Sequence, residues 1–112
     1  MEETEKNLKA IRESLDNLDL SSQEQEIFLF LVEMKSPWPT SAIARELEIY
    51  RQTLFSNLKS MTERQLLTET RQGKNAYFQT DFHHLEKYVN LKLNTLESSL
   101  LLLRHLLKSN QQ

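Results

Sequence analysis

The amino-acid sequence predicts a mainly α-helical protein with one small β-hairpin, and three observations indicate this fold class. Two short helical patterns, at residues 40–47 and 51–61, are separated by only three residues. Two segments rich in threonine and aromatic residues follow at 66–70 and 77–80, and the turn between them holds Gly73, the only glycine. Helical patterns with regularly spaced leucines occupy both ends of the chain. This order is typical of a winged helix-turn-helix whose N- and C-terminal helices form a dimerisation coiled coil.

The composition is that of an ordinary globular protein and excludes several classes. Charged residues make up 27% and hydrophobic residues 38% of the 112 residues, which predicts one domain with helical extensions. There is no cysteine, so disulfides and thiolate metal sites are excluded and a reducing cytoplasm is the expected location. The acidic start lacks the apolar run of a signal peptide, and Leu100–Leu107 is too short to span a bilayer. We expect a soluble cytoplasmic protein without a membrane partner.

Charge is distributed unevenly along the chain, whose formal net charge is −2. Residues 1–35 carry nine acidic and four basic side chains, whereas residues 36–80 carry six basic and four acidic ones. The positive balance coincides with the helix-turn-helix and the hairpin, where a nucleic acid would be bound. We therefore predict an N-terminal dimerisation and packing helix (1–19), a DNA-binding domain (20–80) and a C-terminal dimerisation helix (81–112).

The second predicted helix is the core helix of the domain, because it is apolar over a wide arc between residue 22 and about Lys35. The residues at its start offer a capping box, from Ser21 or Ser22 with Glu24 or Gln25. The segment 36–39 holds two prolines and ends the helix. Trp38 between them either packs against the base of the hairpin or is an exposed aromatic anchor.

The helix-turn-helix has a buried stripe and a polar face. Leu54, Leu58 and Met61 recur at intervals of four and three and form the stripe. The other face is rich in the side chains that bind base edges and phosphates, although an ordinary solvated helix has the same composition. We expect base-edge contacts from Arg51, Gln52, Thr53 and Ser56, phosphate contacts from Lys59 and Arg64, and hydroxyl or helix-terminus contacts from Thr40 and Ser41.

The hairpin is expected to act as a wing beside the recognition helix. Its glycine suits a turn that requires a positive φ, at Gln72-Gly73. Arg71, Lys74 and Asn75 surround this turn and are expected to reach the phosphate backbone or the minor groove. The alternative is a solvated basic loop without a ligand.

The C-terminal helix carries a coiled-coil seam. Asp81 is the expected N-cap, and the helix runs to about Lys108. Further leucines lie outside this seam, so a second face of the C-terminal helix must also be buried against another element. The narrow apolar stripe of the N-terminal helix is suited to cover that second face. We expect a homodimer, and the alternative is a monomer whose two end helices form an antiparallel hairpin. The predicted interface residues are Leu8, Ile11 and Leu15 in the first helix and Val89, Leu93, Leu96, Leu100, Leu103 and Leu107 in the last.

The sequence resembles the DNA-binding domain of the TrmB-type regulators of archaea and bacteria in three segments, at residues 20–31, 40–49 and 51–67. The resemblance covers about residues 18–80, and a C-terminal dimerisation helix is also typical of that family and its MarR-like relatives. It implies DNA binding and dimerisation. It gives no support for an effector, because this sequence ends where larger members carry a sugar-binding domain.

Single positions both match and depart from the TrmB-type pattern. Arg51 corresponds to the arginine that opens the family's recognition helix, and Phe55 corresponds to its usual aromatic residue. Tyr50 stands where the family has a proline, and Gln65 stands where it has a glycine.

No pattern in the sequence indicates an enzyme, a cofactor, a metal or a small-molecule ligand. His83 and His84 are adjacent, so on a helix they point about 100° apart and make a poor metal pair. A single glycine excludes a phosphate-cradling loop. The remaining alternative is a winged helix that binds protein rather than DNA, with Trp38 and Tyr50 as its anchors. Steep salt dependence distinguishes DNA binding from that alternative.

Overall fold

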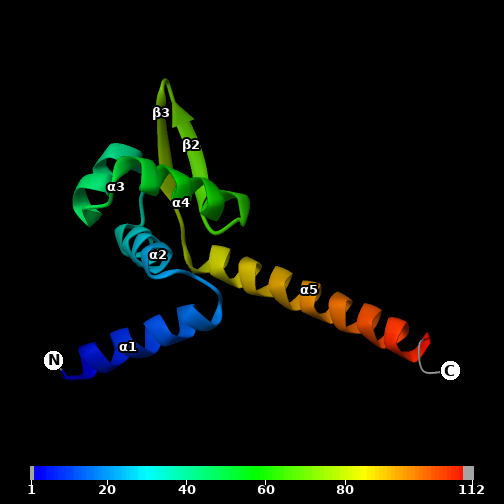
Figure 1. Cartoon of the computed structure of the whole chain (residues 1–112). Helices are drawn as coiled ribbons and strands as arrows, with labels where there is room; N and C mark the ends of the chain where they lie inside the picture. Colours follow the sequence, from blue (N-terminus) through cyan, green and yellow to red (C-terminus); the bar gives the residue numbers. More distant parts are fainter. Residues whose placement is uncertain (1, 110–112) are drawn as a thin grey trace.

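The computed structural model describes residues 2–109, and the side chains of residues 5–109. Within this part of the chain, the helices and the hairpin strands follow the order that the sequence predicts (Figure 1). One additional short strand, β1, is present. Residue 1 and residues 110–112, at the ends of the predicted terminal segments, lie outside the described residues. The elements are α1 (Glu2–Asn17), α2 (Ser22–Met34), β1 (Trp38–Pro39), α3 (Thr40–Leu47), α4 (Arg51–Glu63), β2 (Thr68–Gln72), β3 (Asn75–Gln79) and α5 (Phe82–Ser109).

The hydrophobic core lies between α2, the helix-turn-helix and the base of the hairpin. Leu66 and Leu67, which the sequence predicts as the start of a strand, are buried in this core before β2 begins. The hairpin therefore begins two residues later than predicted, because these leucines pack inward instead of pairing with β3. The fully buried side chains include Ile27, Leu31, Ile43, Leu54, Leu58 and Met61, as the helical periodicities predict.

The sheet has three antiparallel strands in the order β1-β3-β2. The short strand β1 was not predicted; it pairs Trp38 with Phe78 at the base of the hairpin. Trp38 is partly buried and also packs edge-on against Phe30, with ring centroids 4.9 Å apart, so packing against the base of the hairpin is the alternative that is observed. At the other end, Gln72 pairs with Asn75 and Gly73 adopts a φ of 65°, which confirms the glycine at the tip.

The predicted capping groups are present. Ser21 accepts a hydrogen bond from the Glu24 amide, and the Glu24 carboxylate accepts one from the Ser21 amide, so the capping box is complete. The Asp81 carboxylate accepts a hydrogen bond from the amide of His84, at 3.1 Å, and caps α5. These caps fix where α2 and α5 begin.

The two end helices do not pack against each other. Figure 1 shows α1 and α5 diverging from the body, with α5 extending far beyond it. Only the first turns of α5 contact the chain, where the Tyr88 hydroxyl donates to the Leu18 carbonyl at 2.8 Å and Lys92 pairs with Asp19 at 2.5 Å. The prediction that α1 covers α5 is therefore wrong within one chain, and the monomeric hairpin of end helices is not observed. Instead, the end of α1 packs against α2, where Leu15 is buried.

The predicted seam residues of α5 remain exposed in the single chain, except Val89, which is half-buried. Leu93, Leu96, Leu100, Leu103 and Leu107 each expose at least half of their surface. Leu8 and Ile11 of α1 are also exposed, at 45% and 42%. None of the described helices combines the length and the apolarity that a membrane crossing requires.

Candidate nucleic-acid interface

Helices α3 and α4 form a helix-turn-helix because a three-residue turn, Glu48–Tyr50, reverses the chain between them. Glu48 adopts a φ of 52°, the left-handed conformation that commonly ends a helix. The Ile49 amide donates to the Ala44 carbonyl at 3.1 Å, and the Ile49 side chain is buried. The turn is thus anchored in the core through Ile49, and the polar face of α4 is directed away from it.

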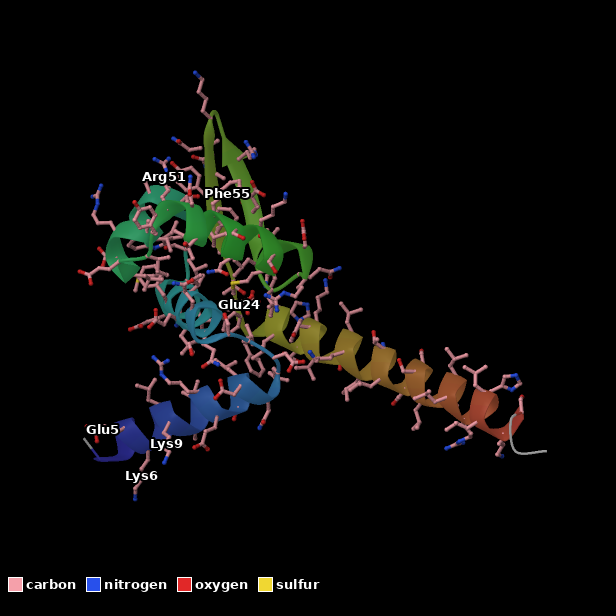
Figure 2. All side chains as sticks on the ribbon, viewed as in Figure 1. Glu5, Lys6, Lys9, Glu24, Arg51 and Phe55 are labelled. Carbon is pink, nitrogen blue, oxygen red and sulfur yellow. The ribbon has the colours of Figure 1, made fainter. Side chains whose placement is uncertain are left out.

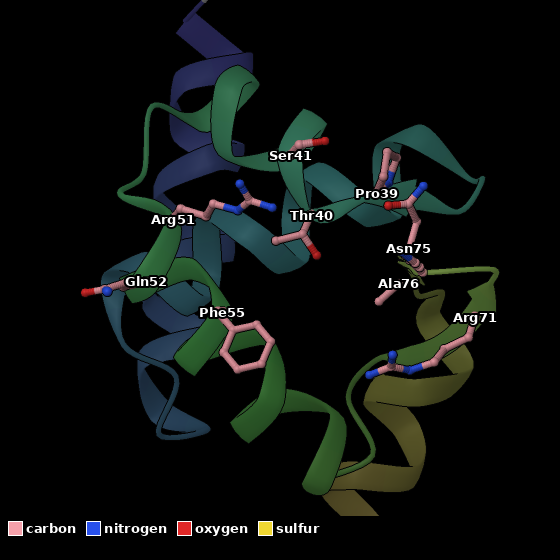
Figure 3. A pocket seen from close by; sticks show the side chains of 10 residues that line it. Pro39, Thr40, Ser41, Arg51, Gln52, Phe55, Arg71, Asn75 and Ala76 are labelled. Atoms are coloured by element: carbon pink, nitrogen blue, oxygen red, sulfur yellow. The ribbon is translucent and has the colours of Figure 1, made fainter.

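A hollow of about 520 Å³ lies between α4 and the hairpin (Figure 3). It brings together three separate parts of the chain: the N-terminus of α3, the first two turns of α4 and the tip of the hairpin. In Figure 2 this region lies on the face of α4 opposite α2. Of the residues predicted to bind DNA, Thr40, Ser41, Arg51, Gln52, Arg71, Lys74 and Asn75 line the hollow, and Pro39, Phe55 and Ala76 complete it.

The electrostatics of the hollow favour an anion. Its lining contains the basic side chains of Arg51, Arg71 and Lys74 and no acidic one. Arg71 pairs with Glu69 at 3.3 Å, but its side chain is 70% exposed, so this surface pair is weak and exchangeable. Helix α3 begins after Pro39, which gives no side-chain cap, so the positive end of the α3 dipole opens onto the same hollow.

Comparison with known proteins identifies the fold. No protein-family model matches the sequence, and neither does any curated protein. A crystal structure of the adhesin competence repressor (AdcR) from Streptococcus pyogenes is similar over 96% of this chain and 81% of that chain, with a TM-score of 0.54 and 15% identity. A C-terminally His-tagged form of AdcR gives a TM-score of 0.52 and 16% identity, over 93% of this chain and 81% of that chain. The fold is a winged helix. At these identities the similarity establishes the fold alone.

Three predicted DNA-binding residues of the winged helix lie outside the hollow. Thr53, Ser56 and Lys59 are exposed on α4 but do not line the space beside the wing. They follow the helix on its outward surface, next to Gln52. Helix α4 therefore has two exposed polar surfaces, one facing the wing and one facing away from the core.

Arg64 is the exception among the predicted residues. It forms an ion pair with Glu24 of α2, and its Nε donates to the Ser60 carbonyl at 3.4 Å. The Glu24 carboxylate is nearly buried and also completes the capping box of α2. Arg64 thus fastens the end of α4 to α2, and a phosphate contact by Arg64 would compete with this ion pair.

Gln65 takes over the role of the glycine found at this position in TrmB-type regulators. It adopts a φ of 66°, so the left-handed conformation is present without glycine. Its amide donates to the Thr62 carbonyl at 3.0 Å and the following Leu66 amide donates to Met61 at 2.9 Å, which closes α4.

Sequence reasoning did not assign Phe55 to the interface. Phe55 lies one helical turn after Arg51, and the ring points into the hollow (Figure 3). It exposes 61% of its surface although it is aromatic. The i to i+4 spacing from Arg51 was the signal that would have found it.

A hydrogen-bonded chain links the wing to α5. The His84 imidazole donates from Nδ1 to the Asp81 carboxylate at 2.8 Å, and its Nε2 accepts from the Thr68 hydroxyl at 2.6 Å. These hydrogen bonds from His84 lower the pKa of the Asp81 carboxyl. The order of hydroxyl, imidazole and carboxylate resembles a catalytic triad, but each group here has a structural partner: β2 is tied to the cap of α5. Among the described residues no group of three or more His, Asp or Glu side chains is placed to hold a metal ion.

Proposed function

We propose that this chain is a sequence-specific, double-stranded DNA-binding transcription regulator that acts as a homodimer. The hollow between α4 and the wing is the observation that carries the proposal. It collects three basic side chains, several hydrogen-bonding groups and a helix N-terminus without an acidic residue, which is the chemistry of a site for a phosphate backbone and base edges. The description of the similar solved structures as a repressor agrees with this function.

Helix α4 is the recognition helix in this proposal. Its exposed polar surfaces match the hydrogen-bonding pattern of the major groove. Arg51 and Gln52 contact base edges, together with Thr53 and Ser56 on the outward surface, and Lys59 contacts phosphate. Thr40 and Ser41 bind a phosphate at the start of α3.

The wing binds the DNA backbone or the minor groove. Arg71, Lys74 and Asn75 are exposed around the tip and are held there by the β2–β3 ladder. The excess of basic over acidic side chains in residues 36–80 is used for ion pairs with phosphate in this proposal.

Helix α5 provides the dimer contacts. Its exposed leucines form an apolar surface that a soluble monomer has no reason to keep exposed. Pairing two copies along Val89 to Leu107 presents two recognition helices to successive major-groove turns, roughly 34 Å apart. The expected operator is therefore pseudo-palindromic.

A protein-binding winged helix is the second candidate, and one observation favours it. Tyr50 exposes 80% and Phe55 exposes 61% of its surface, and both lie at the start of α4. Exposed aromatic side chains are common anchors in protein interfaces. In that case the same face would bind a partner with little dependence on salt.

Fluorescence anisotropy with a mixed-sequence DNA duplex separates the two candidates. A dimer with six to ten phosphate contacts loses roughly 10³–10⁵ in affinity between about 50 and 200 mM salt. A loss of this size supports DNA binding. Absence of binding at the lower salt concentration excludes it and leaves the protein-binding candidate.

Two arginine variants test how Arg51 acts. Arg51→Ala is expected to cost about 1–3 kcal/mol on the preferred operator and to relax the sequence preference. Arg51→Lys keeps the charge but loses the planar fork, so it should restore binding to mixed-sequence DNA without restoring the preference. Equal losses on all sequences would make Arg51 a phosphate contact instead.

The wing is tested by Lys74→Ala, with Lys9→Ala as the matched control on α1. Removing Lys74 should weaken binding evenly across sequences and reduce the salt slope by about one unit per wing. Lys9 is exposed and far from the hollow (Figure 2), so its removal should change neither the affinity for DNA nor the salt slope. An unchanged slope in Lys74→Ala would remove the wing from the interface.

A further inference from the structure

Phe55 is the one large apolar side chain that lines the hollow, and it is poorly covered by its own chain. It exposes 61% of its surface, whereas Leu54 and Leu58 on the same helix are buried. Its ring is directed into the space between α4 and the wing (Figure 3). A single exposed aromatic residue on a protein surface is unremarkable, but this one lies where the proposed ligand is expected to bind.

The lining of the hollow around Phe55 contains both apolar and basic residues. Ala76 on β3 and Pro39 before α3 are the other apolar residues of the lining. Arg51 reaches the hollow from α4 and Arg71 reaches it from the wing (Figure 3). The hollow therefore suits a ligand that combines anionic groups with an apolar group.

We infer that Phe55 is a specificity-determining residue that recognises the 5-methyl group of thymine in the major groove. This inference rests on the proposed DNA-binding function. The thymine methyl is the apolar group that base pairs present in the major groove, and phenylalanine is among the side chains that contact it. Arg51, one turn earlier on α4, brings the adjacent base edge or phosphate into register.

The deoxyribose of the backbone is the competing apolar group, and a chemical substitution separates the two. Deoxyuridine differs from thymidine only by the absence of the 5-methyl group, so it keeps the sugar, the phosphate and the base-pairing groups. Burying one methyl contributes about a fourfold change in affinity. Packing on the sugar predicts no such change.

The experiment begins with selection of a preferred duplex from a randomised library by the full chain. Each thymine of that duplex is then replaced by deoxyuridine, one position at a time, and affinity is measured by anisotropy. The wild type should lose about fourfold at one thymine in each half-site. In Phe55→Ala this loss should disappear at that position alone, which is the coupling expected for a direct contact.

Two controls keep the result interpretable. Phe55 is mostly exposed, so truncating it leaves no cavity, and circular dichroism should show an unchanged fold. Tyr50→Ala removes the neighbouring exposed aromatic, which does not line the hollow, and should retain the fourfold effect.

The outcomes for the inference and for the proposed function are distinct. Equal affinity for thymine and deoxyuridine at every position, with salt-dependent binding intact, overturns the role of Phe55 and leaves the DNA-binding function standing. Discrimination between thymine and deoxyuridine that persists in Phe55→Ala also overturns the role of Phe55. Absence of binding to any duplex contradicts the proposed function itself.

Discussion

Replacing Leu100 of α5 by alanine is expected to weaken the proposed homodimer by about 30-fold. Leu100 lies in the middle of the seam, and 58% of its surface is exposed in the single chain. Complete burial of a leucine side chain contributes about 2 kcal/mol, so burying the exposed part in a dimer contributes about 1 kcal/mol. A symmetric dimer loses this contribution twice, or about 2 kcal/mol, which corresponds to about 30-fold in the dissociation constant.

Sedimentation equilibrium over a range of protein concentrations measures this constant directly. Ser98→Ala is the matched control, because Ser98 is exposed on the same helix but is not a seam position. The distal part of α5 makes no described contact with its own body, so Leu100→Ala should leave the unfolding of the winged helix unchanged. Identical dissociation constants for Leu100→Ala and the wild type would refute the proposal that the seam residues form the dimer interface. A wild type that stays monomeric at the highest soluble concentration would refute the dimer.

Three further predictions concern the scaffold. Leu54→Ala should lower the free energy of unfolding by about 2–5 kcal/mol, because Leu54 is fully buried, and a urea titration showing a loss below about 1 kcal/mol would contradict this. Gly73→Ala should destabilise the hairpin by about 1 kcal/mol and Gly73→Asn by less, because the φ of 65° strains an L-residue while an added Cβ meets no neighbour. Unchanged hydrogen exchange of the hairpin amides in Gly73→Ala would show that this backbone strain is absent. Hydrogen bonds from His84 hold the pKa of Asp81 below its ordinary value of 3.8, so this stabilisation is present above that pH and is lost as the pH falls through the lower folded value. The melting temperature of the wild type should therefore fall more steeply than that of Asp81→Asn as the pH is lowered below 3.8, and parallel curves would contradict the role of Asp81.

The parts of the fold that local spacing determines were predictable from the sequence. Leu54, Leu58 and Met61 recur with the period of a helix, so the buried face of α4 followed from position alone. Gly73 and the basic residues beside it indicated the tip of the wing. The polar and basic residues of the hollow were predicted because a polar helix face and a hairpin tip are both local features, whereas Phe55 was not.

The parts that depend on distant partners were not predictable. The stripe of Leu8, Ile11 and Leu15 showed which face of α1 is apolar, but it could not show that this face turns toward α2 instead of α5. The ion pair of Arg64 was not predicted because its partner, Glu24, is 40 residues away in the sequence. A strand as short as β1 shows no alternation of apolar and polar residues, so its pairing with β3 gave no signal.

The central claim is that DNA lies in the hollow between α4 and the wing, and an NMR titration of isotope-labelled protein with a duplex at low salt tests it most directly. The account predicts that amide shifts concentrate at the start of α3, at Arg51 to Phe55 and at Arg71 to Ala76, with little change in α1 and the distal half of α5. Shifts centred on α1 or α5, with the hollow unaffected, would contradict it.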